Sequence, residues 1–156
     1  MNFNDFLDIK SVAISLLAGN KKALLESMLS LAYNSARIIN KDEVKKVVYE
    51  RERIKSTGIG NGIAIPHARS NSISGATASF AILENPVDYD SIDGNPVSIV
   101  FLLLGQDNKV GSHLRLLSRI SRLLKDDDCR KNLMAAKSPD EIIQILGKYS
   151  EILLEE

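Results

Sequence analysis

The segment that decides the fold is Val97-Ser98-Ile99-Val100-Phe101-Leu102-Leu103-Leu104, which is apolar at almost every position. A strand with one wet face alternates apolar and polar residues, whereas a continuous apolar run is typical of a central strand covered on both faces. The turn residues Asp93-Gly94-Asn95-Pro96 precede it. Before that turn, Ala76 to Leu83 forms a second apolar run. The sequence therefore predicts two central strands, at 76–83 and 97–104.

Weaker signals extend this sheet, and helical patterns lie on both sides of it in the sequence. Short apolar runs at 12–17 and 63–65 predict two further strands. Apolar spacing predicts helices at 21–38 and from 109 onward, and the cap residues Asn40 and Ser138 predict helix starts before 42–53 and 139–141. The expected fold is α/β: a single layered domain over residues 1–156, with a mixed central β-sheet flanked by helices on both sides.

Composition excludes several classes of protein. The chain has 156 residues, 44% of them hydrophobic and 26% charged, which is typical of a globular domain. Twenty basic residues balance twenty acidic ones, so there is no general electrostatic attraction for nucleic acid or an anionic membrane. Cys129 is the only cysteine, which excludes an internal disulfide. No apolar run could span a bilayer, and Asp5 and Asp8 do not suit an export signal, so we expect a cytoplasmic protein without membrane insertion.

The most unusual segment runs from Ser56 to His67 and reads STGIGNGIAIPH. Its three glycines let the backbone approach a ligand, and the N–H groups of Gly58, Gly60, Asn61 and Gly62 could cradle an anion. The segment is not a nucleotide phosphate loop, because no Lys-Ser or Lys-Thr follows the glycines. It also fails the dinucleotide pattern, since the third glycine comes one position early. A tight turn between helix and strand is the alternative interpretation.

Two histidines and one arginine are the candidate reactive residues. His67 follows a short strand and a proline, so we expect it in a loop at the end of the sheet, where a neutral imidazole could act as a nucleophile. His113 lies at the start of an expected helix, on its apolar face, and Ser112 could cap that helix. Arg51 could supply positive charge. The alternative for His67 is an ordinary surface or packing histidine, and for His113 it is a core histidine. The alternative for Arg51 is a solvated surface charge.

The stretch from Arg51 to His67 resembles the active-site signature of the fructose/mannitol-type IIA domains of the bacterial phosphoenolpyruvate-dependent phosphotransferase system. Its form is closest to the nitrogen-regulatory IIA branch. The resemblance extends over nearly the whole chain, because residues 88–97, 112–114, 129–130 and 138–141 also resemble family segments. One position departs from the pattern: Ala68 follows the histidine where relatives usually have glycine, which would strain the backbone if a positive φ were needed there.

The resemblance implies a phosphoryl carrier. It makes His67 the phosphoryl acceptor, His113 a stabilising second histidine and Arg51 a neutralising cation. It implies a donor of the HPr type, itself phosphorylated by enzyme I, and an apolar patch around His67 on which that donor docks. No metal or other cofactor is needed, and two histidines without a cysteine or matching carboxylates make a poor zinc site.

For the downstream role, the resemblance to the nitrogen-regulatory branch favours a regulatory module, whose phosphorylation state decides whether it binds a target protein. The alternative is a sugar-uptake component that passes the phosphoryl group to a IIB domain. A metal- or nucleotide-binding protein without phosphorylation is a third, more distant interpretation.

Overall fold

The chain folds into one mixed sheet with helices on both faces. The computed structural model describes residues 2–154. The turns η1 (Phe3–Asp5) and η2 (Ile9–Ser11) lead into β1 (Val12–Leu16), and the helices α1 (Lys21–Ala32) and α2 (Lys41–Ile54) follow. The next strands are β2 (Gly58–Gly60), β3 (Ile63–Ala64), β4 (His67–Ser70), β5 (Thr77–Val87) and β6 (Val97–Gln106). The helices α3 (Val110–Leu124), α4 (Asp127–Ala135) and α5 (Pro139–Leu154) complete the described part.

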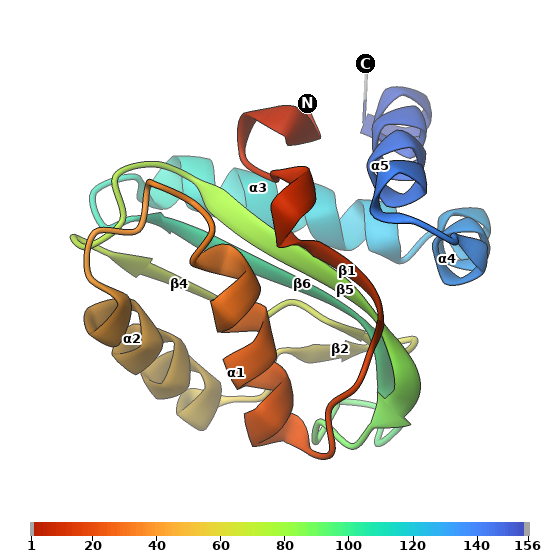
Figure 1. Cartoon of the computed structure of the whole chain (residues 1–156), viewed down its shortest axis with the longest axis horizontal. Coiled ribbons are helices and arrows are strands. Elements are labelled where there is room, and N and C mark those ends of the chain that lie inside the picture. Colours follow the sequence, from red (N-terminus) through yellow and green to blue (C-terminus); the bar gives the residue numbers. More distant parts are fainter. Residues whose placement is uncertain (1, 155–156) are drawn as a thin grey trace.

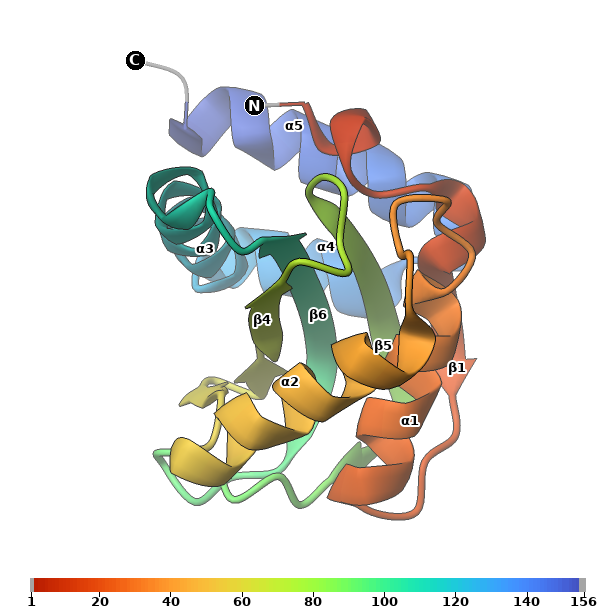
Figure 2. The ribbon, with the colours of Figure 1, turned by 90° about the vertical axis from the view of Figure 1, so that its left-hand side faces the viewer.

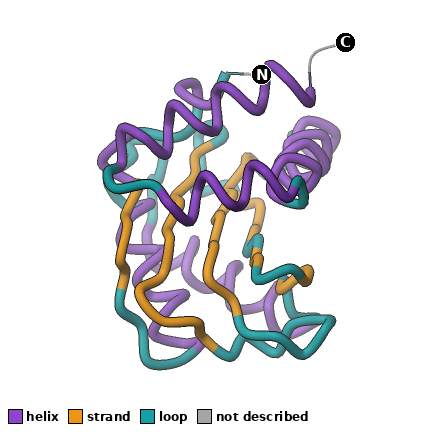
Figure 3. Tube along the Cα trace, turned by 90° about the vertical axis from the view of Figure 1, so that its right-hand side faces the viewer, coloured by secondary structure: helices purple, strands orange, loops and turns teal. Residues whose placement is uncertain are grey.

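Strand β6 is the centre of the sheet. The strand order is β1-β5-β6-β3-β2, and β4 also pairs with β6. β5 runs antiparallel to β6, whereas β3 and β4 run parallel to successive parts of it, at Ile99–Val100 and at Leu103–Gln106. Figure 1 shows α1 and α2 on one face of this sheet and α3, α4 and α5 on the other. Figures 2 and 3 show the strands between the two helical layers. The predicted α/β fold with a mixed, doubly covered sheet is confirmed.

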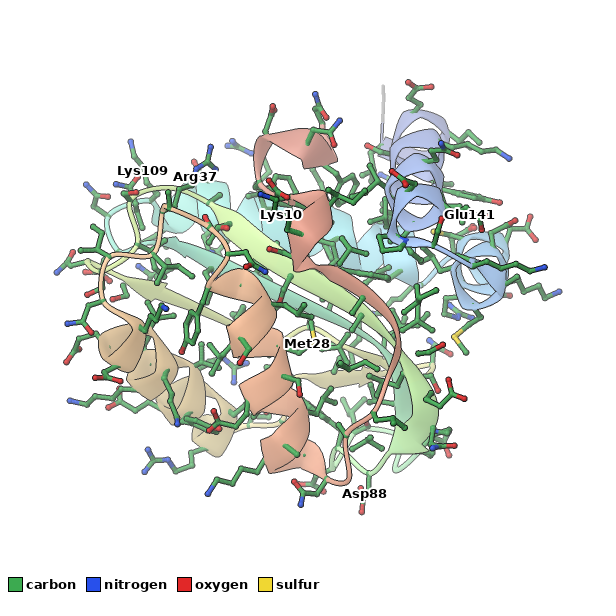
Figure 4. The ribbon with its side chains drawn as sticks, in the orientation of Figure 1. Lys10, Met28, Arg37, Asp88, Lys109 and Glu141 are labelled. Carbon is green, nitrogen blue, oxygen red and sulfur yellow. The ribbon has the colours of Figure 1, made fainter. Side chains whose placement is uncertain are left out.

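The alternation along β6 explains why this strand is apolar at every position from Ile99 to Leu104. Ile99, Phe101 and Leu103 belong to the core under α3, α4 and α5. The residues between them, Val100, Leu102 and Leu104, belong to the core under α1 and α2. Side chains of a strand alternate between faces, so a sheet with two covered faces needs apolar residues at every position. Met28 of α1 is fully buried over the strands (Figure 4).

Some boundaries differ from the sequence-based expectation. The helix predicted to reach Ile38 ends at Ala32, because Asn34 lies in a turn where its side chain donates to the carbonyls of Lys10 and Leu31. Strands β2 and β4 were not predicted as strands. The Asn40 cap is confirmed by its bond from the Glu43 N–H, and Ser138 accepts from the Glu141 N–H. In residues 2–154, no helix is both long and apolar enough to cross a membrane.

Candidate functional site

His67 is the first residue of β4 and is held by the central strand. Ile63–Ala64 pairs with β6, Pro66 interrupts the ladder because it has no N–H, and pairing resumes where His67 lies beside Leu103. The expectation of a loop histidine is therefore wrong: His67 is a strand residue and is half-buried. Alternation places His67 and Arg69 on the α3 side of the sheet, since the intervening Ala68 packs in the core under α1 and α2.

The hydrogen bonding of His67 fixes which ring nitrogen is free. Its Nδ1 lies 2.8 Å from the carbonyl oxygen of Ile65. A carbonyl can only accept, so Nδ1 carries the proton and donates, and Nε2 of the neutral ring keeps its lone pair. Burial lowers the pKa of His67, and the positive charge of Arg51 lowers it further. The ring is therefore neutral near pH 7, with Nε2 available as a nucleophile.

His113 faces His67 from helix α3. The two ring centroids are 5.8 Å apart, and the ring planes are inclined by 50°. His113 is buried, and burial lowers its pKa to about 4, with further lowering by His67 and Arg69. Its Nε2 is buried and has no hydrogen-bond partner within the described residues. A neutral ring with an unused nitrogen beside His67 can bond an incoming oxygen atom.

The start of α3 differs from the prediction in one respect. Ser112 does not cap this helix, which begins two residues earlier at Val110; its N-cap is Lys109, without a side-chain cap bond. His113 is thus the fourth residue of α3, and its N–H donates to the Lys109 carbonyl. The predicted position on the buried face of the helix is confirmed, because Ile120, Leu123 and Leu124 are buried with it.

A glycine makes room for the ring of His113. Gly105 of β6 lies beside Arg69 in the register, and the face of β6 that carries Leu103 also carries Gly105. A Cβ atom at Gly105 would lie 2.8 Å from Nδ1 of His113. Because any larger residue would push against that ring, the close packing of α3 on β6 depends on a glycine here.

Cations surround this histidine pair. Arg51, in the last turn of α2, lines a hollow of about 380 Å3 together with His67, and its Nη1 donates to the Lys55 carbonyl at 2.8 Å. Lys55 and Lys125 line the same hollow. Arg69 lies 3.5 Å from a carboxylate oxygen of Asp107 and is close enough to His113 to lower its pKa. The arrangement combines a nucleophilic nitrogen with fixed positive charge, which suits the binding of a phosphoryl group.

One known protein family matches most of this chain. The family model described as "Phosphoenolpyruvate-dependent sugar phosphotransferase system, EIIA 2" matches residues 5–149. The chain belongs to this EIIA 2 family.

Relatives of this EIIA 2 chain include regulatory and sugar-specific proteins. It is 34% identical over 149 residues to a nitrogen regulatory protein of Bradyrhizobium diazoefficiens, covering 94% of this chain and 95% of the relative. It is 31% identical over 151 residues to the fructose-specific EIIABC component of Bacillus subtilis, covering 97% of this chain but only 24% of that longer protein.

Solved structures of the same fold are also similar. The nitrogen regulatory protein IIA-Ntr from Neisseria meningitidis is 33% identical and superposes with a TM-score of 0.85, covering 92% of this chain and 98% of that one. The Escherichia coli mannitol IIA domain, solved in complex with phosphorylated IIB, has a TM-score of 0.78 over 92% of this chain and 99% of that one. At 15% identity, that likeness shows the fold alone.

The glycine segment of this EIIA 2 chain forms a hairpin, which sequence reasoning missed. Strand β2 pairs antiparallel with β3, and Asn61 and Gly62 make the two-residue turn with positive φ values of 58° and 76°. The Gly58 N–H is oriented to the hydroxyl of Ser56, and the Asn61 N–H donates to Asp93. Of the four proposed cradle residues, Gly58 lines the His67 hollow, whereas Asn61 and Gly62 line a different hollow beside α4.

Gly58, Gly60, Asn61 and Gly62 therefore do not present their N–H groups together at His67. The reason is the hairpin turn: it projects Asn61 and Gly62 beyond the end of β2, while Gly58 stays at its start. Gly58 is needed for packing as well, because a Cβ there would lie 2.4 Å from the hydroxyl oxygen of Ser91. The Asn-Gly pair was the signal that could have revealed the hairpin.

A buried carboxylate bonds to the lining of the hollow, and the sequence did not single it out as a site residue. Glu52 is 8% exposed and accepts hydrogen bonds from the N–H and hydroxyl of Thr57, from the Tyr89 hydroxyl at 2.8 Å and from Lys21 at 2.9 Å. Lys21 also lies over the Tyr89 ring, 4.4 Å from its centroid. Since Thr57 lines the hollow, this network fixes the wall that faces His67.

Ala68 is accommodated without strain. It lies in β4, buried and paired with Leu104, and it is not among the residues with positive φ. The methyl group of Ala68 therefore packs in the core, and the expected backbone strain at this position is absent.

The hollow also has apolar walls. Ile59, Ile65, Ile92 and Leu117 contribute to its lining, and Ile92 is 72% exposed. The described residues hold no group of three or more His, Cys, Asp or Glu side chains arranged to bind a metal ion.

Proposed function

We propose that this EIIA 2 chain is a phosphoryl carrier that accepts a phosphoryl group on Nε2 of His67 from a phosphorylated HPr-type carrier protein. The observation that carries the proposal is the hydrogen bond from His67 Nδ1 to the Ile65 carbonyl. It holds the proton on one nitrogen and leaves the other as the nucleophile, already oriented and partly shielded from water.

The proposed step is a transfer between two imidazole rings. The Nε2 lone pair of His67 attacks phosphorus, the bond between phosphorus and the donor's histidine nitrogen breaks, and that nitrogen keeps the electron pair. The proton on His67 Nδ1 stays hydrogen-bonded to Ile65 throughout. No net oxidation or proton release is required, so the residues need only position the group and balance the charge on its oxygens.

His113 and Arg51 supply that balance in this proposal. The unpartnered Nε2 of His113 can donate to a phosphoryl oxygen when it carries the ring proton. Arg51 lies in the same hollow as His67 and neutralises charge as the group arrives. Arg69, on the His67 side of β4, is a further candidate cation that the sequence did not single out. Of the four candidate cradle residues, Gly58 is the one that lines this hollow.

For the downstream role, we propose regulation in a nitrogen-type phosphotransferase system within the cytoplasm. The support is the likeness to nitrogen regulatory proteins over almost their full length, compared with about a quarter of the fructose-specific relative. Delivery of the phosphoryl group to a IIB domain for sugar uptake is the second candidate. Its support is the fructose-specific relative and the fold shared with a mannitol IIA domain solved with its IIB partner.

The experiment is a reconstituted transfer assay with phosphoenolpyruvate, enzyme I and an HPr-type carrier. We expect one acid-labile phosphoryl group per chain in the wild type and none in the His67→Ala variant, with near-identical circular dichroism spectra for both. Labelling of the variant, or no labelling of the wild type by several cognate carriers, would contradict the proposal. Adding a IIB domain then separates the two downstream roles, because only the sugar-uptake role predicts rapid loss of label.

A further inference from the structure

A second hollow on the described surface lies between α1 and α2 and is larger than the hollow around His67. It measures about 940 Å3, and its lining shares no residue with the hollow around His67. Lys21 at the start of α1 pairs with Glu52 near the end of α2, and Lys45 of α2 pairs with Glu26 of α1, so the two helices run antiparallel. They lie side by side on the same face of the sheet (Figures 1 and 2).

The charges along this groove are unbalanced. Five basic and three acidic side chains line it, and the two ion pairs use two of each. Three of the basic residues, Lys22, Lys46 and Arg53, are exposed and make no ion pair or hydrogen bond within residues 2–154. Among the acidic residues of the groove, Asp42 alone is left outside the two ion pairs. A row of unpaired cations attracts an anionic occupant.

The spacing of the cations favours an elongated occupant. Lys46 and Arg53 are seven residues apart on α2, which corresponds to about 10.5 Å along the helix. A single phosphate group would have to draw both long side chains inward to meet it, whereas an elongated anion can pair with both where they stand. A helix with acidic residues two turns apart matches it, because positions i and i+7 lie on one face at the same separation.

The floor of the groove is partly apolar. It is formed mainly by the half-buried ring of Tyr49, which is held by its hydroxyl bond to Glu26 at 2.6 Å, and Leu25 lies beneath at 3% exposure. The methylene groups of the lysines add further apolar surface. A groove between two helices, with an apolar floor and charged edges, is suited to the apolar face of a third helix.

We propose that the α1–α2 groove is a docking site for an acidic amphipathic helix of a partner protein. The groove is separate from the His67 hollow, so the partner would dock while His67 stays open to its phosphoryl donor. This inference does not rest on the proposed phosphoryl transfer, and its test uses unphosphorylated protein.

The test is a binding titration with a defined probe. The probe is a fluorescent 16-residue peptide, stapled as a helix, with leucines on one face and glutamates seven residues apart at its edge. We expect saturable binding, weakened about tenfold by the double substitution Lys46→Glu and Arg53→Glu. The matched control carries Lys131→Glu and Lys148→Glu, which change the net charge equally on exposed surface outside the groove. The control should bind like the wild type.

Two altered peptides and a map of the contact complete the test. We expect weaker binding when the glutamates are replaced by glutamine and also when the leucines are replaced by serine. In amide NMR spectra, the shifts should fall on α1 and α2. The proposal is overturned if no peptide binds, if the control variant is weakened equally, if the leucine-free peptide binds as well, or if the shifts map to the His67 hollow.

Discussion

Replacing Gly105 with alanine would push His113 away from the phosphoryl-accepting histidine. The added Cβ would lie 2.8 Å from Nδ1 of His113, about 0.6 Å inside the 3.4 Å at which ordinary contact begins. Any movement of the ring disturbs its surroundings, because His113 is buried and its helix packs through Ile120, Leu123 and Leu124. Either the ring rotates or the first turn of α3 lifts, and both change the position of Nε2 relative to His67.

Gly105→Ala should reduce both the rate of phosphoryl transfer and the stability of the fold. A displacement of about 1 Å at a reacting centre can reduce a rate by about 10²-fold, and overpacking a core commonly costs about 1–3 kcal/mol. We therefore expect Gly105→Ala to slow phosphoryl transfer to His67 by about 10- to 100-fold and to lower the free energy of unfolding by about 1–3 kcal/mol. Rapid-quench single-turnover assays and urea titration measure the two quantities.

Two controls isolate the proposed cause. In Gly147→Ala in α5, the added Cβ would meet no heavy atom within 4 Å apart from the neighbouring backbone of its own helix, so this variant should leave the transfer rate unchanged. A double-mutant cycle with His113→Ala gives the stronger test, because removing the ring should remove most of the rate penalty of Gly105→Ala. Fully additive rate effects, or an unchanged rate in the Gly105→Ala single variant, would refute the reasoning.

Four further predictions concern the site. His113→Gln should still be labelled at His67, but onward transfer or loss of the phosphoryl group should change by about 10²–10³-fold in rapid-quench assays, since one placed donor has moved; equal kinetics would leave His113 a packing residue. Glu52→Gln should lower the free energy of unfolding, measured in urea, by about 1–3 kcal/mol, because the positive charge of Lys21 loses its buried partner. The control Glu50→Gln, at an exposed position, should have almost no effect. Equal losses in the two variants would show that the buried bonds of Glu52 do not stabilise the fold. The pKa of His113 is about 4 in the folded chain and 6.5 when unfolded, so between these pH values the unfolded chain binds a proton that the folded chain does not. The stability that the neutral ring gives above pH 6.5 is therefore lost as the pH falls toward 4. Between pH 7 and pH 5 the wild type should lose about 2 kcal/mol more than His113→Gln, and parallel pH profiles would rule out a buried neutral ring.

The pH dependence of acceptance depends on His67. Burial lowers its pKa below the ordinary 6.5, so the nucleophilic neutral ring predominates at pH 7 and above. The transfer rate should stay level there and fall only at lower pH, once the pH passes the lowered pKa. This is measured as initial labelling rate against pH, with the donor already phosphorylated.

Periodicity was enough to predict the layers of the fold. The unbroken apolar run of β6 reflects two covered faces, and the two cores do alternate along it. The buried position of His113 was predictable for the same reason, because helical spacing ties it to Ile120 and Leu124. These features depend on which face of a strand or helix is buried, and a buried face leaves apolar residues at regular spacing in the sequence.

The features that the sequence did not predict depend on contacts between distant residues. Strand β4 has four residues, follows a proline and gains its hydrogen bonds from β6, so no local pattern marks it. The bonds of Glu52 to Tyr89 and Lys21 join segments more than thirty residues apart. Arg69 could not be placed beside His67 until β4 was known to be a strand, because only strand alternation puts both on one face.

The atom that carries the phosphoryl group tests the central claim most directly. The protein would be labelled with 15N in its histidine rings, phosphorylated through the HPr-type carrier and examined by long-range proton–nitrogen NMR. We expect phosphate to be bound to Nε2 of His67, with a proton retained on Nδ1 because Ile65 accepts its hydrogen bond. Phosphate on Nδ1 of His67, or on either nitrogen of His113, would contradict it.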